Sequence, residues 1–106
     1  MSKYTTDKWV VIAITNPHGD IIHKVLASWY GGYTGSDSYQ LSSGITDVKE
    51  SDDEYEFTNQ SGSVYICHKK CYGMSNYTAS IHSGFTERIP PGYSVSILTE
   101  SEVQSL

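Results

Sequence analysis

Basic residues and cysteines are both scarce in this chain. Its 106 residues include seven Lys and Arg against twelve Asp and Glu, and only two Cys. Phosphate contacts by Lys and Arg provide most of the non-specific affinity of proteins for nucleic acid. The formal net charge of −5 therefore argues against direct binding to DNA, RNA or anionic membranes, and it favours a basic protein as the partner.

Long apolar runs are absent as well. The apolar run Trp9–Ile14 is too short for the core of a signal peptide or for a membrane span, and the residues before it are polar. We therefore expect a cytoplasmic protein with reduced thiols, in the host cell if a phage encodes it. Two glycosylation sequons, at Asn59 and Asn76, are on this view chance matches in a chain rich in Ser and Thr.

The residues that are abundant favour strands. Leu and Ala are few, whereas Ser, Thr and Tyr are common, and this balance disfavours helix and favours sheet. The continuous apolar, β-branched run Trp9–Thr15 predicts a central strand that is buried on both faces. A dense turn signal at Asn16–Asp20 and a second run at Ile21–Tyr30 complete a predicted hairpin.

Four further segments predict strands: Tyr39–Val48, Glu54–Thr58, Ser63–His68 and Tyr93–Leu98. In the first segment, Gly44 indicates a bulge. In the second, Tyr55 and Phe57 alternate with polar residues, as in a strand with one buried face.

The hydrophobic period changes after Gly73. Apolar residues then recur every fourth position, at Tyr77, Ile81, Phe85 and Ile89, which predicts a helix over about 76–89 that Pro90 ends. Strands in series with one late helix indicate an α+β fold. We expect one domain spanning 1–106, with an antiparallel sheet of five to six strands, the helix packed on one face, and frayed ends at 1–7 and 99–106.

Half of the carboxylates lie in one ten-residue segment. They are Asp47, Glu50, Asp52, Asp53, Glu54 and Glu56. The segment lacks the alternating acids and Gly of an EF-hand loop, and an exposed turn lacks the apolar pocket that a glycosidase acid needs. A solvated face is the simplest interpretation. The functional interpretation is a negative patch that docks a Lys/Arg-rich partner and speeds the encounter.

A second candidate segment combines aromatic, Gly and small polar residues. Its candidate contact residues are Trp29, Tyr30, Tyr33, Asp37 and Tyr39. The segment lacks the Gly-Lys-Ser/Thr of a phosphate-binding loop. Its composition is typical of a paratope, in which Tyr and Trp give large rigid contacts and Ser and Gly adapt. The alternatives are a platform that stacks on sugars and a long loop whose aromatic side chains belong to the core.

A third candidate is the Cys-x3-Cys segment. Its possible metal or thiol groups are Cys67, His68 and Cys71, with His82 further along the chain. Zinc knuckles usually have Cys-x2-Cys spacing and a second ligand pair, and neither is present. If the segment is a strand, Cys67 and His68 point to opposite faces. We therefore expect no metal, no cofactor and no catalytic residue.

In size, charge and its acidic segment, the chain resembles the small acidic accessory proteins of bacteriophages and other mobile elements, including anti-CRISPR inhibitors. The resemblance implies a non-catalytic inhibitor that acts as a DNA mimic. It would dock the acidic hairpin and the aromatic loop on a basic nucleic-acid-handling protein.

Two alternatives stay open. One is a carbohydrate-binding module that uses the Trp/Tyr/Gly loop. The other is a small metal- or thiol-dependent enzyme centred on the Cys-x3-Cys segment.

Overall fold

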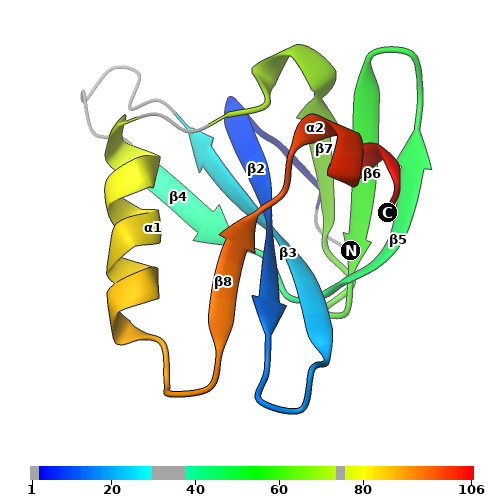
Figure 1. Cartoon of the computed structure of the whole chain (residues 1–106). Helices are drawn as coiled ribbons and strands as arrows, with labels where there is room; N and C mark the ends of the chain where they lie inside the picture. Colours follow the sequence, from blue (N-terminus) through cyan, green and yellow to red (C-terminus); the bar gives the residue numbers. More distant parts are fainter. Residues whose placement is uncertain (1–2, 30–37, 74–75) are drawn as a thin grey trace.

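The computed structural model describes residues 3–29, 38–73 and 76–106. Within these residues, eight strands form two four-stranded sheets, with strand orders β1-β7-β6-β5 and β4-β3-β2-β8 (Figure 1). The strands are β1 (Lys3–Thr5), β2 (Lys8–Thr15), β3 (Ile21–Trp29), β4 (Ser38–Leu41), β5 (Ile45–Glu50), β6 (Glu54–Asn59), β7 (Val64–His68) and β8 (Ser94–Ile97). The helices are η2 (Lys69–Cys71), α1 (Asn76–Arg88) and α2 (Glu100–Gln104).

The predicted hairpin is confirmed by the antiparallel pair β2–β3. Trp9 and Val11 of β2 lie in the core between the two sheets, whereas Val10 and Ile12 belong to a second cluster on the other face. The prediction of a strand buried on both faces is therefore correct. The turn is held by Asn16, whose Oδ1 accepts hydrogen bonds from the amides of the second and fourth residues after it, both at 2.9 Å.

The prediction of a single five- to six-stranded sheet is wrong, because the segment Tyr39–Val48 is divided between two sheets. Its first part is β4 in one sheet, and its second part is β5 in the other. Between them, the buried Ser42 accepts a hydrogen bond from the Val25 amide through its Oγ, at 2.8 Å. The Ser42 amide in turn donates to the Val25 carbonyl at 2.9 Å, so Ser42 is bonded to β3 where the chain leaves the first sheet.

The bulge of this segment also lies at a different position from the one predicted. The register shift lies between Ile45 and Asp47 of β5 rather than at Gly44. Gly44 is instead at a close approach, because a Cβ there would lie 3.2 Å from Cγ2 of Ile22.

Within the described residues, both ends that were expected to be frayed contain secondary structure. β1 pairs with β7 in parallel, an exception to the expected antiparallel sheet, and the ring of Tyr4 lies 5.2 Å from that of Tyr65. At the other end, Thr99 and Glu102 form a capping box that starts α2. Val103 of this helix is 2% exposed. Burial of these apolar groups offsets the entropy of ordering the ends.

The predicted helix is confirmed as α1, which ends one residue before the expected limit. Figure 1 shows α1 beside β4 and β8. The side chains of Tyr77, Ile81 and Phe85 lie outside the described residues. Ile89 borders an apolar groove with Ile12 and Val95, so the C-terminal end of the helix approaches the face of the sheet opposite the sandwich core.

Candidate protein-binding surface

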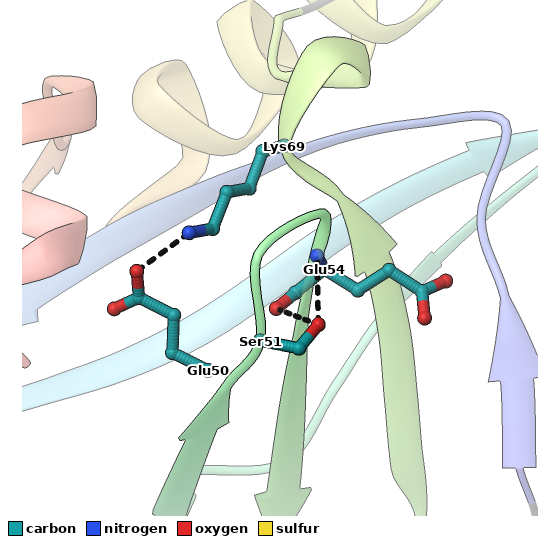
Figure 2. A network of polar contacts seen from close by, with 4 residues as sticks. All are labelled: Glu50, Ser51, Glu54 and Lys69. Carbon is teal, nitrogen blue, oxygen red and sulfur yellow. Dashed lines mark hydrogen bonds and ion pairs between the residues drawn. The ribbon is translucent and has the colours of Figure 1, made fainter.

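The acidic segment forms the β5–β6 hairpin. Lys49 lies opposite Glu56 in the antiparallel register. At the turn, the Ser51 amide donates to the Glu54 carbonyl at 2.8 Å. The Glu54 amide donates to Ser51 Oγ at 3.2 Å, and Ser51 Oγ donates to the Glu54 carbonyl at 3.3 Å (Figure 2). The Lys69 amide also donates to the carbonyl of Asp53 at 2.8 Å. The hairpin tip is therefore fastened to the end of β7.

Alternation separates the side chains of the hairpin onto two faces. Tyr55 and Phe57 are 4% and 0% exposed and belong to the core. Successive strand residues point to opposite faces, so Glu54 and Glu56 face away from the core. The register places Asp47 opposite Thr58 on this same outer face. We call the outer-face acids Asp47, Glu54 and Glu56, with the tip acids Asp52 and Asp53, the acidic face.

Glu50 lies on the opposite side of the hairpin. Its carboxylate forms an ion pair with the Lys69 ammonium, with 2.5 Å between Oε2 and Nζ. Figure 2 shows this pair on one side of the hairpin and the Glu54 carboxylate directed to the other. The hydrogen bond from Lys69 to Glu50 raises the pKa of the ammonium. Glu50 is therefore partly neutralised and does not belong to the acidic face.

In the described part of the chain, the five members of the acidic face differ from Glu50 in lacking an ion pair. Within the described residues, no Lys, Arg or His forms an ion pair with any of them. The register also places Lys49 on this face, opposite Glu56, and on the neighbouring strands it places His68 and Lys3 there.

Trp29 and Tyr39, the two candidate residues of the aromatic segment that the structure describes, do not lie with the acidic face. Trp29 is half-buried, its indole N–H donates to the Thr5 carbonyl at 2.7 Å, and its ring meets Tyr4 edge-on at 6.4 Å. Tyr39 is 40% exposed, but β4 lies at the edge of the other sheet. Tyr30, Tyr33 and Asp37 lie outside the described residues. Trp29 therefore packs on β1 rather than standing free for a partner.

The Cys-x3-Cys segment carries two free thiols. Cys67 is 0% exposed, and burial raises its pKa to about 12, so the thiol is protonated at neutral pH and cannot act as a nucleophile. As the strand register requires, Cys67 lies opposite Tyr55 and His68 lies opposite Glu54.

The remaining candidate ligands do not converge with these two. His68 Nδ1 accepts a hydrogen bond from the amide of Lys70 at 3.1 Å. Cys71 is half-buried, and His82 is on α1. No group of three or more His, Cys, Asp or Glu side chains could hold a metal ion in the part of the chain that the structure describes.

Sequence reasoning missed a small cavity beside the hairpin. It has a volume of about 130 Å³ and lies between the end of β7 and α2. Its lining includes Trp9, Tyr55, Tyr72, Lys69 and Glu100. These residues come from β2, β6, η2 and α2 and the segments beside them, so no local pattern joins them. The one local signal was Thr99-x-x-Glu102, the capping-box spacing that places α2.

Comparison of the chain with protein-family models, with characterised proteins and with solved structures found no match. Among the helices that the structure describes, none has both the length and the apolar character needed to cross a membrane.

Proposed function

We propose that this protein is a non-catalytic protein-binding module that docks its acidic face on a Lys/Arg-rich surface of a nucleic-acid-handling protein. The observation that carries the proposal is the outer face and tip of one fastened hairpin, where five carboxylates have no ion-pair partner among the described residues. The partner's basic surface normally holds nucleic acid, so the module acts as an inhibitor of the kind that mobile elements encode.

The spacing of the carboxylates supports joint action. Residues two apart on a strand are separated by about 6.7 Å, and neighbouring strands by about 4.8 Å. Both spacings are shorter than the Debye length of about 8 Å at physiological ionic strength. A basic partner therefore meets the acidic face as one concentrated charge, which speeds association and favours it over like-charged partners.

Rigidity supports the same function. Tyr55 and Phe57 fix β6 in the core, and the bond between the Lys69 amide and the Asp53 carbonyl fixes the tip. A preorganised surface loses little conformational entropy when it binds. The half-buried position of Trp29 on Thr5 gives no support to a sugar-stacking platform built on that residue.

The test is competition with nucleic acid. Purified protein is added to a basic DNA-binding domain that carries a labelled duplex, and displacement is followed by fluorescence anisotropy at increasing salt. We expect displacement that weakens as salt rises. Reversing Asp52, Asp53, Glu54 and Glu56 to Lys should weaken it at least about tenfold. Displacement that is unchanged by this reversal, in a variant whose circular dichroism matches the wild type, would refute the proposal.

A further inference from the structure

Three aromatic residues that pack against one another, Trp9, Tyr55 and Tyr72, line part of the cavity beside the hairpin. The Trp9 ring lies 5.7 Å from the Tyr55 ring at 68° and 4.6 Å from the Tyr72 ring at 74°. Tyr72 is fixed in place, because its hydroxyl donates to the Leu98 carbonyl and accepts from the Val11 amide. The walls are therefore rigid π-systems, whose faces carry negative potential and attract cations.

A cation of the protein itself already lies at this cavity. The Lys69 ammonium is 5.2 Å from the centroid of the Tyr55 ring and bonds to Glu50 at 2.5 Å. Cations within about 6 Å of an aromatic centroid gain from the ring's quadrupole. The side chain of Lys69 is 29% exposed, so it can turn out to solvent without disturbing the core.

Carboxylates add negative potential around the same cavity. Burial raises the pKa of Tyr55, and the charge of Glu50 adds to this, with a smaller part from Glu100. Burial likewise raises the pKa of Tyr72, and Glu100 and Glu102 add to it. Glu100 also lines the cavity. The carboxylate of Glu100 on α2 therefore raises the pKa of both Tyr55 and Tyr72.

We propose that this cavity binds an organic ammonium group, namely the side-chain ammonium of a lysine on the basic partner, which replaces Lys69 beside Tyr55 and Glu50. Three aromatic lining residues, the lining carboxylate Glu100 and a volume of about 130 Å³ suit an alkylammonium. The identity of the donor as a partner lysine rests on the proposed function, whereas binding of the ammonium group itself does not.

The experiment titrates the ¹⁵N-labelled full chain with n-butylammonium chloride at constant ionic strength, with n-butanol as the neutral control. We expect saturable shifts of the Trp9 indole N–H and of the α2 amides with butylammonium and not with butanol. Lys69→Met removes the competing ammonium and should raise the affinity about tenfold. The matched control Lys70→Met, on the exposed neighbour outside the cavity, should leave the affinity unchanged. Glu100→Gln should lower it.

Equal shifts with butylammonium and butanol would overturn the inference. So would the lack of saturable shifts in a folded Lys69→Met variant. These results are separate from the test of the proposed function. Loss of ammonium binding together with normal displacement of DNA overturns the inference alone. Ammonium binding together with displacement that ignores charge reversal of the acidic face overturns the proposed function alone.

Discussion

The two sheets of this molecule differ in how they are covered. In β2, adjacent residues such as Val11 and Ile12 are both buried, because one faces the other sheet and the next faces the second apolar cluster beside α1. In β6, burial alternates, so that Phe57 is in the core and Glu56 faces outward. A continuous apolar run therefore indicates a strand that is buried on both faces. A strict alternation indicates a strand with one buried face and one exposed face.

The difference also indicates where the binding surface lies. In the sheet β4-β3-β2-β8, the face away from the sandwich core carries a buried apolar cluster and an apolar groove. In the sheet β1-β7-β6-β5, the residues of β6 on the corresponding face are polar and only half-buried. On that face, β5 and β6 carry acids at the positions where β2 carries Val and Ile. Strand positions that face away from the sandwich core therefore carry apolar side chains that pack in one sheet and charged side chains in the other.

The largest effect is expected within β6 itself. Phe57→Ala removes a side chain that is 0% exposed and should lower the free energy of unfolding by about 3–5 kcal/mol. Glu56→Ala, one position away on the outer face, should change it by less than about 0.5 kcal/mol. Urea denaturation measures both. Similar losses of stability for the two variants would contradict the assignment of Phe57 to a buried face and of Glu56 to an exposed face.

In β2, by contrast, the outward-facing position should matter as well. Ile12 is 1% exposed, and Ile12→Ala should cost about 2–4 kcal/mol in the same denaturation experiment. An effect as small as that of Glu56→Ala would show that this face of the sheet is not covered in solution.

The buried thiol gives a pH-dependent effect. The pKa of Cys67 in the fold, about 12, is above its ordinary value of 9.0, so folding disfavours the thiolate. The contribution of Cys67 is therefore fully present below pH 9.0 and is lost as pH rises toward about 12. In that window, wild-type stability should fall more steeply than that of Cys67→Ala, by up to about 1.4 kcal/mol per pH unit.

Urea denaturation from pH 8 to pH 11 compares the two proteins. Parallel slopes would show that Cys67 is not buried as a thiol. Reaction with a thiol reagent at pH 8 supplies an independent check, because the half-buried Cys71 should react faster than Cys67.

The smallest effect concerns the cap of α2. Thr99→Ala removes the hydroxyl that accepts from the Glu102 amide at 3.2 Å and should cost about 1 kcal/mol. The exposed neighbour Ser101 is the control, since Ser101→Ala should change the stability by less than about 0.5 kcal/mol. Thermal unfolding followed by circular dichroism measures the two variants. Equal midpoints would mean that the cap does not hold α2 against the core.

Local patterns predicted the elements whose residues interact with near neighbours in the sequence. The β2–β3 hairpin follows from an apolar run and a turn anchored by Asn16, and α1 follows from its four-residue period. The division of Tyr39–Val48 was not predictable in this way. The alternation there continues across Ser42, and the bonds of Ser42 to β3 are made with Val25, seventeen residues away in sequence.

The candidate site was predicted in part for the same reason. Alternation within the β5–β6 hairpin places Glu54 and Glu56 together on the outer face. Alternation also places Glu50 on the other face from Asp47, but it does not indicate the contact between Glu50 and Lys69, because that contact spans nineteen residues. The cavity needs four separate parts of the chain, and α2 is too short to show a helical period. Only its capping box was visible in the sequence.

The most direct test of the account is a chemical-shift footprint of a decalysine peptide on the ¹⁵N-labelled protein. We predict that the largest shifts fall on the hairpin residues 47–56. They should be reduced in the Glu54→Gln/Glu56→Gln variant and unchanged in the matched Asp20→Asn/Glu87→Gln variant, which loses the same charge elsewhere. Shifts spread evenly over the surface, or reduced equally in both variants, would contradict the claim that the acidic face is the binding surface.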